Sequence, residues 1–327
     1  MRLAIVGSGA MGSLFAATLS IHTDLVMLGH WPQQLACLRT AGLTVIHPDE
    51  SRSTHFFPIT DDPNTIAGVD LVLILVKTYQ TVRAALEVKQ LLSRDGLAVT
   101  LQNGLGNVDL LADVLGPERV THGVTTAGAA MLEPGLLRIA GQGVTHLAVQ
   151  AKKEEAVRVL ADLLQLAGFE TYLAYDLDSL AWGKLAVNCG INPLTALLRV
   201  PNGTLAKDVQ ARTLMFAAAE ETAAVAQALG IDLPYPDASQ RVLEVAQATA
   251  ANQSSMLQDV LRGSQTEIDA ICGAVVRNGR KVGVPTPVNE EFLRLIESLG
   301  TRLPGNRIRS KIEPLQILLE QEKGQNN

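Results

Sequence analysis

Aromatic and charged residues are scarce in this chain of 327 residues. Phe, Trp and Tyr make up 4% of it and Asp, Glu, Lys and Arg 18%, whereas 47% of the residues are hydrophobic. This composition excludes a disordered chain and indicates a globular protein with a well-buried core. The net charge is −6 and no basic tract is present, so we do not expect nucleic acid as a partner.

Cysteine is scarce as well. The three cysteines, Cys37, Cys189 and Cys272, form no Cys-x-x-Cys pair. We therefore expect no metal site and no disulfide framework, and reduced thiols in a cytoplasmic protein are the default. Residues 3–19 carry no charge and follow Arg2, as in a signal peptide or short membrane span. Their glycines weaken such an apolar helix, so no membrane partner is expected.

A glycine motif opens the chain. An apolar strand over Met1–Val6 runs into Gly7-Ser8-Gly9-Ala10-Met11-Gly12 and then a helical run, Ser13–Ser20. The order of strand, glycines and helix predicts a dinucleotide site, in which the pyrophosphate lies at the helix N-terminus. The alternative is a glycine-rich turn in another α/β unit.

The choice of nicotinamide cofactor depends on the second strand. Leu25–Leu28 ends at Gly29-His30-Trp31, where NAD enzymes usually place Asp or Glu for the ribose 2′-hydroxyl. Neither is present, which leaves NADP open, with His30 as a donor to the 2′-phosphate and Arg39 as a more distant candidate. A solvent-facing histidine is the alternative, and NADH is not excluded.

Two later strands end in polar residues. The buried run Leu71–Val76 ends at Lys77, and Leu97–Leu101 ends at Gln102-Asn103-Gly104. Ligands bind beyond the carboxyl ends of strands in open α/β sheets. Lys77 is therefore a candidate for cofactor phosphate or substrate carboxylate, and Asn103 for the nicotinamide. A solvated lysine and a turn asparagine are the alternatives.

Near residue 172 the alternation of strands and helices gives way to helices alone. We therefore predict a dinucleotide-binding (Rossmann) domain over residues 1–171 and an all-helical substrate domain over 172–327. The expected helices are Leu180–Leu198, Val209–Leu229, Ala238–Ala251, Ser264–Asn278 and Glu290–Leu299, with C-caps at Gly230 and Gly279, a kink at Pro193 and a frayed helix over 312–327. The Ala-rich part of the second, Phe216–Leu229, allows close helix approach within one subunit or in a homodimer.

Polar residues at helical intervals mark the first of these helices. Lys184, Asn188 and Asn192 are spaced i, i+4, i+8 in an apolar run and share one stripe. An unpaired buried polar group costs roughly 2–7 kcal/mol, so the stripe needs partners. A bound anionic or carbonyl substrate is one solution, and an internal network is the other.

A second polar cluster lies further along the chain. Ser255 and Glu267 flank a turn expected at Arg262-Gly263 and could meet at one pocket. For Glu267 the alternative is a capping box, Ser264-Gln265-Thr266-Glu267. For Ser255 it is an ordinary hydroxyl at a helix end.

These motifs, in this order, resemble the 2-dehydropantoate 2-reductase (ketopantoate reductase) family. The resemblance covers roughly residues 1–300 and is carried by the glycine motif, Val76-Lys77-Thr78-Tyr79-Gln80, Gln102-Asn103-Gly104, Trp182-Gly183-Lys184 with Asn188, Asn192-Pro193-Leu194-Thr195-Ala196, Ser255, and Thr266-Glu267. It implies an α/β fold: an N-terminal Rossmann-type domain followed by an all-α domain like that of 6-phosphogluconate dehydrogenase.

The resemblance also implies a reaction, the NADPH-dependent reduction of a 2-oxo acid in pantothenate and coenzyme A synthesis. It makes Lys184 the general acid, and Asn188, Asn192, Ser255 and Glu267 the substrate-binding residues. Gly7, Ser8, Gly9, Ala10, Met11, Gly12, His30, Lys77 and Asn103 would bind the cofactor. His30 departs from the family, which commonly has arginine there. A reductase of another 2-oxo acid and a non-catalytic NADP(H) sensor are the competing interpretations.

Overall fold

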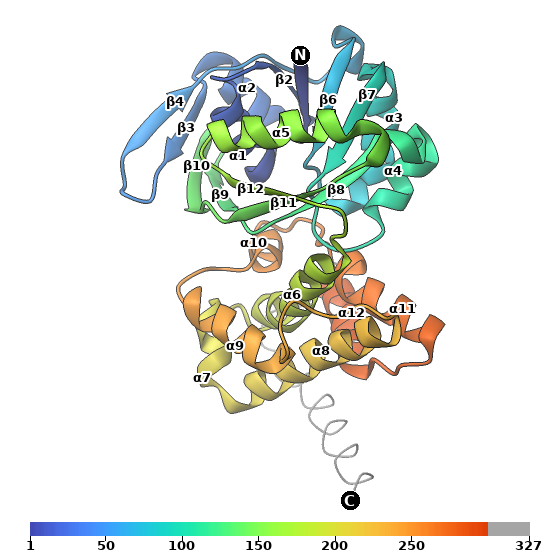
Figure 1. The fold of residues 1–327 in the computed structure, drawn as a ribbon. Coiled ribbons are helices and arrows are strands. Elements are labelled where there is room, and N and C mark those ends of the chain that lie inside the picture. The colour runs from blue at the N-terminus through green and yellow to red at the C-terminus, as the bar shows by residue number, and fades with distance from the viewer. Residues whose placement is uncertain (300–327) are drawn as a thin grey trace, which may run out of the picture. The chain divides into compact units, whose positions relative to one another are not determined.

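The computed structural model describes residues 1–299. Contacts within the chain define two compact units: residues 1–102 with 106–177, and residues 103–105 with those from Asp178 onward (Figure 1). The last strand of the first unit, β12, ends at Ala174. Helices alone therefore begin at Asp178, a few residues after the predicted change at 172. The predicted frayed helix over 312–327 lies outside the described residues.

The first unit is built on a sheet of eight strands. In spatial order these are β12 (Glu170–Ala174), β11 (Val144–Ala148), β8 (Val120–Thr125), β7 (Leu92–Thr100), β6 (Val69–Ile74), β1 (Arg2–Val6), β2 (Asp24–Leu28) and β5 (Ile59–Thr60). From β8 to β5 the neighbours are parallel, whereas β11 is antiparallel to β8. The order β5-β2-β1-β6-β7-β8 is that of a Rossmann sheet, so the predicted α/β fold is confirmed.

Helices cover both faces of this sheet. Leu3 and Ile5 of β1 point to the face covered by α1 (Ala10–Leu19) and α5 (Glu154–Leu166). Ala4 and Val6 point to the face covered by α3 (Thr81–Leu91) and α4 (Asn107–Leu115). Because successive strand residues alternate between faces, a strand buried on both sides has the continuous apolar sequence seen here.

A smaller sheet of four strands completes the unit. Its order is β4 (Arg52–His55), β3 (Leu43–Ile46), β10 (Leu136–Gly141) and β9 (Gly128–Glu133). A turn over Glu133-Pro134-Gly135 joins β9 to β10, and Gly135 has φ +80°. The remaining elements are α2 (Pro32–Thr40) and the short 3₁₀ turns Pro63–Thr65, Thr78–Gln80, Pro117–Arg119 and Ala151–Lys153.

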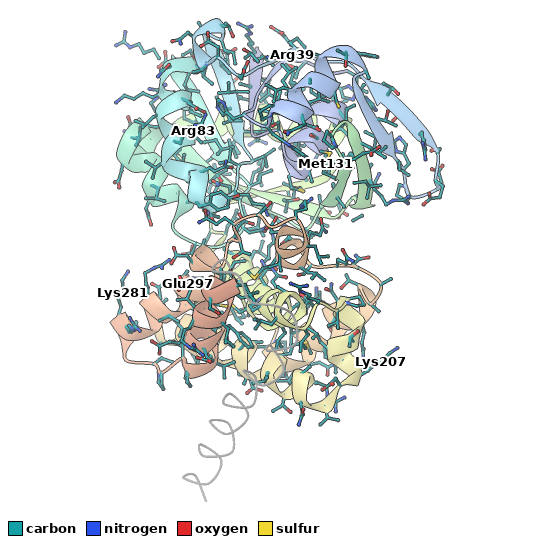
Figure 2. All side chains as sticks on the ribbon, turned by 180° about the vertical axis from the view of Figure 1, so that it is seen from behind. Arg39, Arg83, Met131, Lys207, Lys281 and Glu297 are labelled. Carbon is teal, nitrogen blue, oxygen red and sulfur yellow. The ribbon has the colours of Figure 1, made fainter. Side chains whose placement is uncertain are left out.

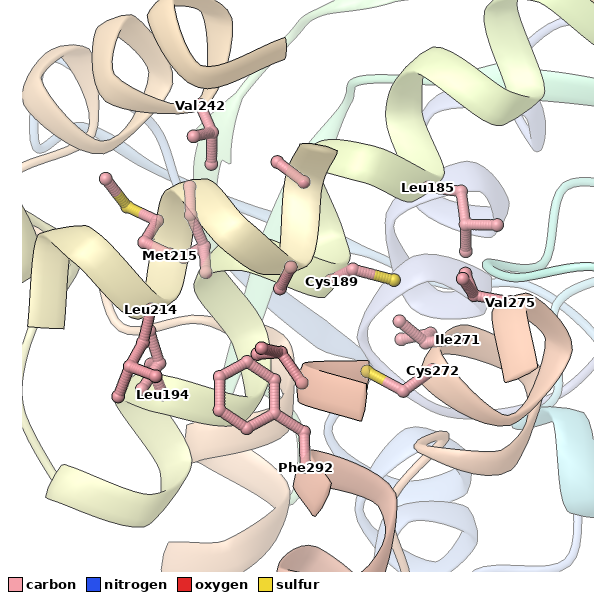
Figure 3. Packing of buried hydrophobic residues seen from close by; sticks show 14 of the residues in the cluster. Leu185, Cys189, Leu194, Leu214, Met215, Val242, Ile271, Cys272, Val275 and Phe292 are labelled. Atoms are coloured by element: carbon pink, nitrogen blue, oxygen red, sulfur yellow. The ribbon is translucent and has the colours of Figure 1, made fainter. Parts of the chain in front are cut away.

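The second unit is helical, as predicted. It contains α6 (Asp178–Leu198), α7 (Asn202–Lys207), α8 (Val209–Ala228), α9 (Ala238–Ala248), α10 (Ser255–Leu261), the π-helix η5 (Asp269–Gly273), α11 (Ala274–Val282) and α12 (Pro287–Leu299). Leu185 and Leu194 of α6 lie in its core with Met215 of α8 and Phe292 of α12 (Figure 3). Cys189 is fully buried there.

Alanine and glycine let α8 approach α6 within the chain. Ala218 and Ala219 of α8 are fully buried in the shared core. A Cβ at Gly190 of α6 would lie 2.9 Å from the Met215 carbonyl oxygen, so only glycine allows this approach. Of the two alternatives for the Ala-rich helix, close packing inside one chain is observed. A homodimer stays a prediction.

Helix ends agree with the sequence in part. Gly230 ends α8 with φ +78°, and the N–H of Ile231 donates to the Ala226 carbonyl, as expected for a C-cap. The predicted cap at Gly279 is wrong, because Gly279 is buried inside α11 and Gly283, with φ +74°, ends that helix. Helix α6 continues through Pro193. Among residues 1–299 no helix is long and apolar enough to cross a membrane.

Candidate active site

The three glycines of the opening motif have different surroundings, and each bears on the turn in a different way. Gly7 has φ +121°, and a Cβ there would lie 2.8 Å from the Leu75 carbonyl. At Gly12 a Cβ would lie 1.8 Å from the Gly7 carbonyl oxygen, so helix α1 could not pack against the turn. Gly9 faces open space, with nothing within 4 Å of its Cβ position. The turn therefore leaves backbone exposed at the position where a pyrophosphate is expected.

The first turn of α1 suits an anion. Gly9 is its N-cap, no side chain caps it, and it has no acidic residue in its first turn. Ala10 and Met11 are the first residues of the helix, while Ser8 is buried in the turn before it. The orphan N–H groups and the positive end of the helix dipole favour a phosphate here. These residues fit a dinucleotide.

Two glycine substitutions should distinguish an effect on the stability of the fold from an effect on dinucleotide affinity. Gly12→Ala should destabilise the fold by about 1–3 kcal/mol, because its methyl group would overlap the Gly7 carbonyl. Gly9→Ala should keep the unfolding temperature and lose dinucleotide affinity, because its φ of −76° suits alanine and its methyl group would occupy the open space. Thermal unfolding and NADPH titration measure the two effects. Equal destabilisation by both variants would contradict this assignment.

His30 lies at the end of β2, as predicted, but it has a partner that the sequence did not indicate. Its Nε2 lies 3.0 Å from Oε1 of Glu87, on α3. The same oxygen accepts a hydrogen bond of 2.9 Å from Nε of Arg83, one helical turn away. The other candidate, Arg39, is paired with Asp61 at 2.8 Å. Arg39 and Arg83 are labelled in Figure 2.

A buried polar network holds the segment that carries Lys77. Lys77 precedes the 3₁₀ turn Thr78–Gln80. Nε2 of Gln102 donates to the Val76 carbonyl at 3.0 Å and to Oγ1 of Thr81 at 2.9 Å. Thr81 in turn donates to Oδ1 of Asn107 at 2.9 Å. Gln102 therefore fixes the position of the Lys77 segment, a role that the sequence did not predict.

The predicted stripe on α6 is present. Lys184 and Asn188 are partly buried, and Asn192 is buried at 6% exposure. Within residues 1–299 the side chains of Asn188 and Asn192 make no hydrogen bond. An internal network therefore does not satisfy the two amides. They fit a bound polar ligand.

Lys184 is paired electrostatically within the helical unit. Burial of its amine lowers its pKa to about 8, and the negative charge of Glu267 limits that decrease. Tyr235, whose pKa burial raises to about 12, donates from its hydroxyl to the Gly183 carbonyl at 2.7 Å. That contact fixes the turn of α6 next to Lys184. A lysine with this pKa can release a proton near neutral pH.

Glu267 is not in a capping box. The π-helix begins at Asp269, and residues 264–266 have no regular secondary structure, so Glu267 precedes the helix. Its carbonyl accepts from the N–H groups of Ala270 and Ile271, both at 3.1 Å. Its side chain is only 5% exposed. The capping alternative is therefore wrong, and the backbone of Glu267 is held by the start of the π-helix.

Ser255 is the first residue of α10, whose position is tied to α6. Oγ of Ser254 caps α10 by accepting from the Leu257 N–H at 3.0 Å. The same oxygen lies 2.7 Å from Oγ1 of Thr195, one turn after Asn192. Within residues 1–299 the Ser255 side chain makes no hydrogen bond. The predicted turn at Arg262-Gly263 is present and ends α10.

Asn103 belongs to the helical unit, although it follows a strand of the Rossmann sheet. The N–H of Leu105 donates to the Ala270 carbonyl at 3.0 Å. Gly104 has φ +75°, and a Cβ there would lie 2.3 Å from the Ala270 oxygen. The π-helix therefore forms backbone hydrogen bonds with both the segment that carries Asn103 and the segment that carries Glu267. No cluster of metal ligands is present within residues 1–299.

Comparison with known proteins agrees with this architecture. The family model described as ketopantoate reductase PanE/ApbA matches residues 3–151, and its C-terminal counterpart matches residues 176–299. The chain is 36% identical over 301 residues to the 2-dehydropantoate 2-reductase of Halobacterium salinarum, covering 90% of this chain and 98% of that one.

Solved structures resemble the chain over most of its length. A PanE/ApbA family ketopantoate reductase from Ralstonia eutropha is 29% identical, with a TM-score of 0.84 and coverage of 92% of this chain and 99% of that one. A D-mandelate dehydrogenase solved with NADH and anilino(oxo)acetate is 26% identical, with a TM-score of 0.84 and the same coverages.

The Rossmann sheet and the glycine turn, together with the relatives that match over most of the chain, identify the chain as a nicotinamide-dependent oxidoreductase. Within that class, the chain belongs to the ketopantoate reductase family.

Proposed function

We propose that this protein reduces 2-dehydropantoate to pantoate with NADPH, with Lys184 as the general acid. The observation that carries the proposal is the amine of Lys184, whose pKa of about 8 reflects its burial, opposed by the charge of Glu267. Asn188 and Asn192 share its stripe and have no hydrogen-bond partner within residues 1–299. A keto acid supplies the acceptors that these donors require.

The cofactor residues follow from the first unit. Gly7, Ser8, Gly9, Ala10, Met11 and Gly12 would hold the pyrophosphate, with His30 at the ribose and Lys77 and Asn103 towards the nicotinamide. The fit rests on the open space at Gly9 and on the uncapped N-terminus of α1. When bound, the cofactor supplies the hydride for the C2 carbonyl.

Lys184 acts on the oxygen of that carbonyl. Its ammonium stabilises the negative charge that builds there and donates the proton that completes the alcohol. Glu267 keeps the amine charged near neutral pH and accepts a hydrogen bond from the substrate hydroxyl. Asn188, Asn192 and Ser255 donate to the carboxylate and carbonyl oxygens of the acid. Each of these side chains lies in the helical unit.

A second candidate function is the same reduction with a different 2-oxo acid as substrate. The D-mandelate dehydrogenase that resembles this chain was solved with NADH and anilino(oxo)acetate. The same donors would serve any 2-oxo acid, because they recognise its carboxylate and carbonyl. Glu267 favours the hydroxylated substrate, since a substrate without the hydroxyl leaves a buried carboxylate without that partner.

A substrate panel tests the proposal. Oxidation of NADPH, followed by its absorbance, should be fastest with 2-dehydropantoate among 2-oxo acids with and without a hydroxyl. A higher kcat/KM with another acid would favour the second candidate. Tight NADPH binding without oxidation by any acid would instead indicate a sensor. Sedimentation of the same sample checks the predicted homodimer.

A further inference from the structure

The end of β2 carries an acidic group that comes from another part of the chain. Glu87, on α3, places Oε1 3.0 Å from Nε2 of His30 and 2.9 Å from Nε of Arg83. Its side chain is 14% exposed, against 28% for His30 and 57% for Arg83. The Glu87 carboxylate therefore lies against the edge of the His30 imidazole and shares one oxygen with Arg83.

This corner lies directly beside the glycine turn. The N–H of Gly7 donates to the Leu28 carbonyl at 2.9 Å. A Cβ at Gly29 would lie 2.4 Å from Cβ of Ser8, so the turn and the end of β2 are in contact. In Rossmann folds the end of the second strand contacts the adenosine ribose of the cofactor. Glu87 thus reaches the place where a 2′-hydroxyl is distinguished from a 2′-phosphate.

The two arginines at this corner are each paired with a carboxylate. Arg83 is paired with Glu87, and Arg39 with Asp61, which follows β5. The hydrogen bond from Arg39 holds the pKa of the Asp61 carboxyl below its usual value. A 2′-phosphate carries a charge of about −2 and would have to compete with these carboxylates for each arginine. A ribose hydroxyl meets no such competition.

One oxygen of Glu87 is suited to the ribose. Both of its contacts fall on Oε1, and Oε2 accepts no hydrogen bond within residues 1–299. We propose that Glu87 is a cofactor-selectivity residue, whose carboxylate accepts from the ribose hydroxyls of NADH and opposes the 2′-phosphate of NADPH. It takes the role that acidic residues at the end of β2 have in NAD enzymes. NADH is then a working cofactor beside NADPH.

The test measures dinucleotide binding without keto acid. Glu87→Gln keeps an acceptor for His30 and Arg83 and removes the charge. It should raise the ratio of the NADH Kd to the NADPH Kd about tenfold, as expected when a like charge beside the phosphate is lost. Nicotinamide fluorescence gives both constants, and thermal unfolding reports whether the fold is kept. Glu155→Gln, an exposed residue of α5, is the matched control and should leave the ratio unchanged.

Other outcomes overturn the inference. An unchanged Kd ratio in Glu87→Gln, or equal weakening of both dinucleotides, assigns Glu87 a structural role in anchoring α3. A second variant, Glu87→Gln with His30→Arg, should shift the ratio further towards NADPH, and no further shift counts against the proposal. Of the proposed function, the inference requires only that the first unit binds a nicotinamide dinucleotide. Failure of the proposed reaction would appear as normal dinucleotide binding without turnover.

Discussion

Replacement of Lys184 by alanine should lower kcat by about 10²–10⁴-fold, the usual contribution of a general acid. Affinity for NADPH should be retained, because the glycine turn belongs to the other unit. Lys184→Arg should also lose most activity, since a guanidinium keeps the positive charge but does not release its proton near neutral pH. Steady-state kinetics and cofactor titration measure the effects. Near-normal kcat in either variant would remove Lys184 from the proton-donor role.

The pH profile provides an independent check on Lys184. In the proposed reaction the reactive form is the ammonium, and its pKa is about 8 because burial disfavours the charge. The value of kcat/KM should therefore be constant below this pH and fall about tenfold per unit above it. In Lys184→Arg the decline near pH 8 should disappear from the residual activity. A decline at the same pH in that variant would assign the titration to another group.

Replacement of Glu267 by glutamine should shift the same profile to lower pH. The carboxylate is the charge that raises the pKa of Lys184 against the effect of burial, so its loss lets that pKa fall further. At pH 8 the variant should then lose activity beyond its loss at pH 6. Asp269→Asn is the matched control, because Asp269 lies two residues away, exposed and paired with Arg277. Its profile should match that of the unmodified protein.

Glu267 should also determine the selection of hydroxylated substrates. A site built to bind a hydroxyl rejects the analogue that lacks it by on the order of 10⁴-fold. In Glu267→Ala most of this preference should disappear, mainly through loss of kcat/KM for the hydroxylated acid. The ratio of kcat/KM for the hydroxylated acid to that for the analogue without the hydroxyl measures this preference. An unchanged ratio would show that the substrate hydroxyl is bound elsewhere.

Local sequence patterns predicted the secondary structure that carries the candidate site residues. The glycines predicted the β1–α1 turn because a side chain at Gly7 or Gly12 would overlap neighbouring backbone, whereas Gly9 leaves open space for a ligand. The spacing of Lys184, Asn188 and Asn192 predicted their common helix, since a periodicity of 3.6 residues places them on one stripe. The continuous apolar strands predicted a sheet covered on both faces.

Contacts between distant segments could not be predicted. His30 meets Glu87 only because α3 packs against the sheet beside β2, and no local pattern encodes that placement. The pairing within the second sheet could not be predicted either, because β3 pairs with β10, which lies far along the chain. Ser264 to Glu267 matched a capping box in sequence, but the N–H of Ser264 donates instead to the Asp259 carbonyl and the helix begins later.

The segment Asn103–Leu105 limits how this protein can be divided into fragments. A polypeptide that spans only residues 178–299 would lack the Leu105 N–H, which donates to Ala270 beside the Glu267 segment. The C-terminal family model, residues 176–299, therefore omits a segment that packs within the helical unit. Expressed separately, that region would expose the backbone of its own π-helix to water, and only the intact polypeptide supplies the missing donor.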